Sequence, residues 1–114
     1  YWDDVWMTAP ASVTSWGERP ADQILNEAWR TGSSWNESYY ANAVYDQTLD
    51  QARASLDEAT AKALYVQAQE LLFQDGGTFI PYQENSRQVL AARVRGIAAV
   101  GEDHLRWHLV DLVE

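Results

Sequence analysis

Residues 55–77 read SLDEATAKALYVQAQELLFQDGG, and this stretch decides the fold of the 114-residue chain. Ser55, followed three residues later by Glu58, has the form of a capping box at a helix start. We therefore expect a helix over about residues 56–74, which the glycines at positions 76 and 77 end as C-cap residues. Apolar residues recur along it at helical spacing. They predict a buried stripe formed by Leu64, Ala68, Leu71 and Leu72.

The helical pattern continues upstream of this stretch. Residues 20–29 predict a short helix, because Ile24, Leu25 and Ala28 fall on one face. Pro20 suits the first position of that helix, where its missing N–H is not needed. The Gly/Ser-rich residues 30–35 then break it. Further along, apolar residues again recur at helical spacing: Tyr45, Leu49, Ala52 and Leu56.

Strands are expected towards both ends of the chain. Residues 1–8 are aromatic and β-favouring, which indicates a strand. Residues 78–82 form a short apolar segment whose Pro81 confines it to a sheet edge or a crossing. Residues 88–95 alternate weakly before Gly96, which marks a turn. At the C terminus, alternating apolar residues predict a last strand, namely Leu105, Trp107 and Leu109.

Composition restricts the class of protein. The length allows one domain at most, and a chain that starts at Tyr1 is expected to be cut from something longer. The formal net charge of −9 argues against nucleic acid or an anionic membrane as partner. No apolar run approaches the roughly 20 residues that span a bilayer. The absence of cysteine excludes disulfides and thiolate chemistry.

The short segment 16–20, WGERP, concentrates recognition groups. Trp16 offers a large flat surface with one donor, and Arg19 offers a planar fork that matches a carboxylate. Gly17 permits close backbone approach. The alternative interpretation is a surface loop whose Trp fills a core and whose Glu18 and Arg19 are solvated.

Sequence motifs of catalysis are missing. The chain has no Walker loop, GxSxG, HExxH or GxGxxG motif. His104 and His108 lie four residues apart, but on a strand they would be about 13 Å apart, too far to share one metal ion. Nothing in the sequence assembles a nucleophile with a base, so a self-contained active site is not expected.

An ordered set of short motifs resembles a known family. Residues 36–53 read NESYYANAVYDQTLDQAR, and the stretches Leu64-Tyr65, 68–72 (AQELL) and Ile80-Pro81-Tyr82 follow in order. The set is similar to the C-terminal part of the extracellular solute-binding proteins of family 5, the peptide-, dipeptide- and nickel-type binding proteins of bacterial ABC importers. Lys62 stands where that family usually has Arg.

This resemblance implies an α+β (mixed α/β) fold: a C-terminal fragment of a two-lobe, type II periplasmic-binding-protein fold with helices packed on short strands. Residues 1–80 would belong to the second, ligand-capping lobe. Residues 81–114 would form the crossover and the returning tail of the first lobe. The intact protein would be periplasmic or otherwise extracytoplasmic, with or without a lipid anchor. It would bind a peptide or another small organic ligand and partner an ABC permease, with no cofactor, no metal and no nucleic acid.

The resemblance also implies which residues face the ligand. Trp16 would stack on it or wall it, and Arg19 would pair with an acidic group or brace the hinge. Asn36 and Tyr39 would lie at the cleft rim. Peptide binders of this family carry an Asp in the corresponding loop, but no Asp lies between Trp16 and Pro20 here. Glu18 could replace it, but we expect Arg19 to neutralise this longer side chain or the side chain to turn to solvent. We therefore expect a ligand with a carboxylate, another anionic oxygen or several hydroxyls, held through Arg19.

Two other functions remain open from the sequence. The first is a carbohydrate-active enzyme that pairs Glu18 with another carboxylate beside exposed tryptophans. The second is a small autonomous protein-interaction domain. A fragment of two lobes would also leave apolar side chains uncovered, so we expect self-association or a partner chain. The residues concerned are Trp2, Trp6, Val89, Leu105 and Trp107.

Overall fold

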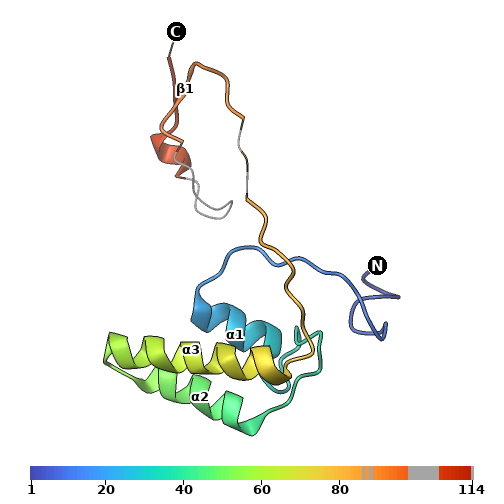
Figure 1. The fold of residues 1–114 in the computed structure, drawn as a ribbon. Helices are drawn as coiled ribbons and strands as arrows, with labels where there is room; N and C mark the ends of the chain where they lie inside the picture. The colour runs from blue at the N-terminus through green and yellow to red at the C-terminus, as the bar shows by residue number, and fades with distance from the viewer. Residues whose placement is uncertain (86, 88, 98–105, 114) are drawn as a thin grey trace. The chain divides into compact units, whose positions relative to one another are not determined.

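The computed structural model describes residues 1–85, 87, 89–97 and 106–113. The chain divides into two units, Tyr1–Phe79 and Ile80–Glu114. The first unit contains the helices α1 (Ala21–Trp29), α2 (Ala43–Ala54) and α3 (Glu58–Asp75) (Figure 1). The second contains the strands β1 (Val94–Arg95) and β2 (Asp111–Leu112) and the 3-10 helix η2 (Trp107–Leu109).

Helix α1 lies where the sequence predicted a helix, with its first residue one position after Pro20. Pro20 is the N-cap, with φ −55° and ψ 149°, so its fixed φ leads the chain into the helix without requiring a donor. The buried residues Leu25, Ala28 and Trp29 form its inner face.

Helix α2 begins after Asn42, whose side-chain oxygen accepts hydrogen bonds from the backbone N–H groups of Val44 and Tyr45 at 2.9 and 3.1 Å. Its buried face consists of Tyr45, Thr48, Leu49 and Ala52. The expected apolar series stops there. Leu56 lies beyond the end of α2 and is fully exposed.

Helix α3 confirms the predicted long helix, but the predicted capping box is wrong. Ser55 is the C-cap of α2, and its backbone N–H bonds to the carbonyls of Gln51 and Ala52. Asp57 is the N-cap of α3 and accepts the Thr60 N–H at 2.8 Å. Because the turn between the helices is so short, Ser55 closes one helix and cannot open the next. Gly76 ends α3 as predicted, and a Cβ at this position would clash with the Leu72 carbonyl.

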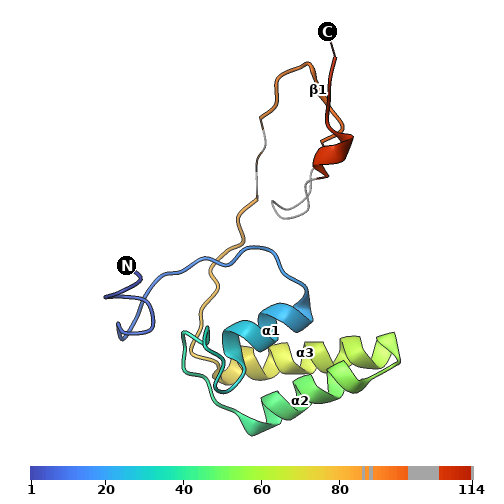
Figure 2. The same ribbon diagram turned by 180° about the vertical axis from the view of Figure 1, so that it is seen from behind.

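The core of the first unit lies between the three helices and the loop before α2. Helices α2 and α3 run side by side as a hairpin, and α1 packs against both, as Figure 2 shows from behind. Of the predicted α3 stripe only Ala68 is buried, while Leu64, Leu71 and Leu72 are half-buried. The buried cluster comprises Leu25, Ala28, Trp29, Tyr40, Tyr45, Leu49 and Ala68.

Helices pack on helices in this unit. No strand is assigned within Tyr1–Phe79, all of which the structure describes. The two-lobe fold class and the assignment of residues 1–80 and 81–114 to separate lobes stay predictions.

The strand predicted for residues 1–8 is wrong. The segment forms turns in which the N–H groups of Val5 and Trp6 both donate to the Tyr1 carbonyl at 2.9 Å. The rings of Trp2 and Trp6 meet edge to face, with centroids 5.6 Å apart. Side chains four residues apart meet in this way on helical turns and not along a strand. Local backbone bonds and aromatic contact therefore replace the sheet partner that a strand would need.

The second unit contains a short antiparallel pair, with Val94 opposite Leu112 and Arg95 opposite Asp111. Of the weakly alternating residues 88–95, only the last two form a strand among those described. Gly96 has φ +81°, which fits the predicted turn. Residues 78–82 carry no strand, so that prediction is wrong. Trp107–Leu109 is a 3-10 turn where a strand was predicted, and Leu105 lies outside the described residues.

The described part of the second unit has no buried apolar residue. Its strand pair is two residues long, too short to cover one face with side chains. Among the residues of this unit that the structure describes, eight large apolar side chains are exposed: Ile80, Tyr82, Val89, Leu90, Trp107, Leu109, Leu112 and Val113.

Candidate functional site

Trp16 and Trp35 form an aromatic corner with the Arg19 guanidinium; we call these three residues the Trp16 corner. The Trp16 ring is half-buried and packs against the core cluster. Its centroid lies 5.8 Å from that of Trp35, with the planes tilted by 53°. The Arg19 Cζ lies over the Trp16 ring at 5.2 Å, a cation–π contact.

Arg19 is engaged within the chain. Its Nη1 donates to the Gly17 carbonyl at 3.1 Å. Its Nε lies 3.3 Å from the Glu27 Oε2, close enough for an ion pair, although the geometry is not that of a hydrogen bond. Gln23, one turn earlier on α1, donates to the other Glu27 oxygen at 3.0 Å. Sequence reasoning considered Glu18 as the partner of Arg19 and missed Glu27, which faces it from α1.

Glu18 is exposed, and it forms no hydrogen bond or ion pair with any residue that the structure describes. The glycine before it and the engaged Arg19 after it leave its carboxylate in solvent. In the WGERP segment, the negative charge of Glu18 is therefore more accessible to solvent than the positive charge of Arg19.

Asn36 lies inside the loop that joins α1 to α2, with 4% of its surface exposed. Its amide nitrogen donates to the carbonyls of Arg30 and Tyr40 at 3.2 and 2.8 Å, and its oxygen accepts from the Tyr40 N–H at 3.2 Å. An Asn side chain that bonds to nearby backbone in this way replaces regular secondary structure. Asn36 thus shapes the loop that carries Trp35.

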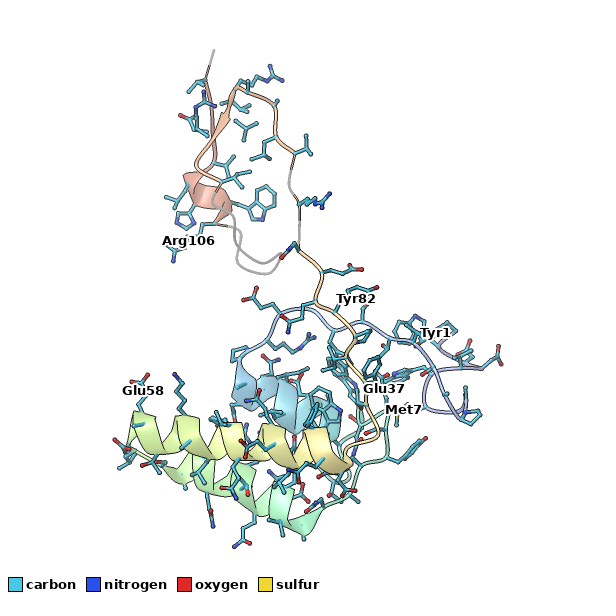
Figure 3. The ribbon with its side chains drawn as sticks, viewed as in Figure 1. Tyr1, Met7, Glu37, Glu58, Tyr82 and Arg106 are labelled. Carbon is cyan, nitrogen blue, oxygen red and sulfur yellow. The ribbon has the colours of Figure 1, made fainter. Side chains whose placement is uncertain are left out.

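Tyr39, by contrast, is 67% exposed and has φ +54°. Its hydroxyl donates to the Met7 carbonyl. A second contact joins the same two segments, because the Thr14 hydroxyl donates to Glu37 at 3.4 Å. Figure 3 labels Met7 and Glu37, on the N-terminal segment and on the loop. The ligand-binding roles of Trp16, Glu18, Arg19, Asn36 and Tyr39 stay predictions.

A polar network that the sequence analysis missed joins all three helices. Arg53 of α2 donates from Nε and Nη2 to the two carboxylate oxygens of Asp22 in α1, at 2.8 and 3.0 Å. The Tyr65 hydroxyl of α3 donates to the same carboxylate at 2.9 Å. Burial raises the pKa of Asp22, but the hydrogen bonds from Arg53 and Tyr65 outweigh it and leave the pKa below its usual value.

The motif residues of α2 also hold elements together. Tyr45 is fully buried, and its hydroxyl donates to the Leu25 carbonyl at 2.8 Å. Burial raises the pKa of this phenol, which therefore stays a neutral donor. Asp46 accepts the Thr31 N–H at 3.1 Å. The motifs that carry the family resemblance therefore supply contacts that hold the helical unit together. The residues that make these contacts are Asn42, Tyr45, Asp46, Arg53 and Tyr65.

The structure also has a shallow depression of about 470 Å³ on the outer face of α3. All of its lining residues come from this one helix, so it has no opposing wall: Val66, Gln69, Glu70, Phe73 and Gln74. Phe73 is 92% exposed. Among the described residues, no group of three or more His, Asp or Glu side chains could hold a metal ion. His108 is exposed on η2, and His104 lies outside the described residues.

The chain is similar to a bacterial solute-binding protein. It is 37% identical over 83 residues to the dipeptide-binding protein DppE of Bacillus subtilis (strain 168), an alignment that covers 71% of this chain and 15% of the relative. The chain therefore spans about 15% of the length of the curated relative that it matches. No protein-family profile matches it, and no solved structure matches it.

The similarity supports a solute-binding role in general terms. The relative is named as a binding protein, which agrees with the expectation that this chain is not an enzyme. Neither the carbohydrate-active enzyme nor the autonomous interaction domain gains support. No helix in the described part of the chain is long and apolar enough to cross a membrane.

Proposed function

We propose that this chain is the C-terminal portion of a family 5 solute-binding protein of a bacterial ABC importer, and that the intact protein binds a peptide or a related small organic solute. The observation that carries the proposal is the 37% identity over 83 residues to a dipeptide-binding protein. The intact protein acts outside the cytoplasm and delivers its ligand to an ABC permease.

The contacts of the motif residues support this proposal. Motifs that match only by chance would have no reason to meet in space. Here Arg53 and Tyr65, from two separate motifs, bind the same Asp22 carboxylate. Asn42 caps α2, and Tyr45 fills the centre of the core. The residues that carry the resemblance therefore depend on one another for a single fold.

Within that function, residues 1–80 belong to the ligand-capping lobe and residues 81–114 to the crossover and tail of the other lobe. The ligand meets the Trp16 corner, where the half-buried Trp16 is held on the core. Exposed Glu18 and Tyr39 flank the ligand. Asn36 contributes by shaping the loop, since its amide is already bonded to the backbone.

Calorimetric titration of the intact protein with a dipeptide such as Ala-Phe tests the proposal. We expect saturable binding, weakened about tenfold by Trp16→Ala, the cost of removing an aromatic anchor. Glu70→Gln on α3 is the control and should leave the affinity unchanged. An intact, folded protein that takes up neither di- nor tripeptides would contradict the peptide-binding role.

A further inference from the structure

The charge on Arg19 is largely balanced before any ligand arrives. Its Nε lies 3.3 Å from the Glu27 carboxylate, and the two side chains are only 26% and 36% exposed. An opposite charge at this distance offsets most of the field that a guanidinium would otherwise present. Arg19 also lies over the Trp16 ring, so the same guanidinium belongs to the ion pair and to the Trp16 corner.

Glu27 is held in place more firmly than Glu18, the other acidic residue considered as a partner of Arg19. It stands on α1, and the Gln23 amide holds its second oxygen at 3.0 Å. Glu18, in the loop itself, is exposed and pairs with no described residue. With Arg19 and Glu27 balancing each other, the acidic residues next to the Trp16 corner along the described chain, Glu18 and Glu37, leave its surroundings negative.

We propose that Glu27 is the specificity-determining residue of the Trp16 corner: by neutralising Arg19, it makes this corner accept flat groups that are uncharged or cationic and disfavour anionic ones. The proposal rests on the proposed ligand role of the corner. It replaces the expectation of a carboxylate held by Arg19, because that expectation needs a guanidinium without an internal partner.

The first experiment measures charge at the corner without any ligand. Iodide, an anionic quencher, and acrylamide, a neutral one, are titrated into the 114-residue protein. The quenching of Trp16 itself is obtained by subtracting the signal measured for the same protein carrying Trp16→Phe. Glu27→Gln should raise iodide quenching of Trp16 about twofold while acrylamide quenching stays constant, because the substitution leaves the Arg19 charge unbalanced.

Two further variants make this result specific. Glu70→Gln removes the same charge from α3 and should change neither quencher. Adding Arg19→Gln to Glu27→Gln should abolish the gain. Circular dichroism shows whether each variant keeps its helices. Iodide quenching that is unchanged in a folded Glu27→Gln variant would overturn the proposal.

The second experiment uses two flat probes of opposite charge on the intact protein, tryptamine and indole-3-acetate, followed through the Trp16 indole N–H signal by NMR. The parent protein should bind tryptamine about fivefold or more tightly than indole-3-acetate. Glu27→Gln should reduce or reverse this difference in affinity. A parent that prefers indole-3-acetate would overturn the proposal while leaving the binding role intact. If neither probe binds although the quenching result holds, the ligand role of the corner fails, and the specificity fails with it.

Discussion

The units Tyr1–Phe79 and Ile80–Glu114 differ in what becomes of their apolar residues. In the first, side chains from three helices and a loop enclose Tyr45 and Leu49, both at 0% exposure. In the second, Trp107 is 69% and Leu112 64% exposed, and no apolar residue of its described part is buried. The first unit can therefore supply its own stability, whereas the second contributes little to the stability of this chain by itself.

The difference follows from the kind of contact each segment needs. An amphipathic helix can bury its apolar face against the next helix along the chain, after a short turn. A short strand needs further strands or a covering helix, which must come from elsewhere. The α2–α3 hairpin buries its apolar faces in this way. The described residues of the second unit supply no third strand and no α-helix to cover the β1–β2 pair.

Tyr45→Ala should lower the stability of the first unit the most. It removes a fully buried ring, its edge contact with Tyr40 and the hydrogen bond to Leu25. We expect a loss of about 3–5 kcal/mol in the free energy of unfolding, measured by urea titration of the helical circular dichroism. Tyr45→Phe, which keeps the ring, should cost only about 1 kcal/mol. Equal losses in the two variants would contradict the packing described here.

Leu71→Ala should have an intermediate effect. A fully buried leucine would cost about 2–5 kcal/mol, but Leu71 is half-buried and packs on the edge of the core. We therefore expect about 1–2 kcal/mol in the same titration. The neighbouring Phe73→Ala is the control: because that side chain is 92% exposed, its loss should be within about 0.5 kcal/mol.

Asp22→Asn should cost about 1 kcal/mol at pH 7, because it weakens a bidentate ion pair that is partly screened by solvent. The folded protein holds the pKa of Asp22 below its usual value. The resulting stabilisation is present above the unfolded pKa of about 3.9 and is lost as pH falls through the folded value. Urea titrations at pH 7 and pH 3 should therefore show the difference between parent and variant shrinking at the lower pH. A difference that grows on acidification would contradict this role for Asp22.

Leu112→Ala should have the smallest effect, within about 0.5 kcal/mol in the urea titration, since this side chain is 64% exposed on β2. A loss of 2 kcal/mol or more would show that the second unit has a core in solution. Sedimentation of the same sample would then test whether self-association, predicted from the sequence, supplies that core.

Helices were predictable from the sequence because their periodicity is local. The apolar spacing in residues 56–74 located α3 to within two residues at its start, and Pro20 located α1. The cap was misjudged because Ser55 and Asp57 are both good N-cap residues. Only the length of the turn after α2, which is a tertiary feature, decides between them.

Strands and long-range polar contacts were not predictable. Residues 1–8 have the composition of a strand, but a strand also needs a partner, and without one the aromatic side chains meet each other on turns. The ion pairs of Glu27 and Asp22 depend on how α1 lies against its neighbours. For Asp22 the sequence offered one usable signal: Arg53 and Tyr65 belonged to the motifs and lacked an assigned partner.

Hydrogen exchange followed by mass spectrometry on the 114-residue protein tests the contrast between the two units most directly. Peptides from α2 and the last three turns of α3 should stay protected for much longer than unstructured chain, since these amides open only with the core. Peptides covering residues 89–97 and 106–113 should exchange within the shortest labelling time. Equal protection of both sets, at a concentration where the protein is monomeric, would contradict the account.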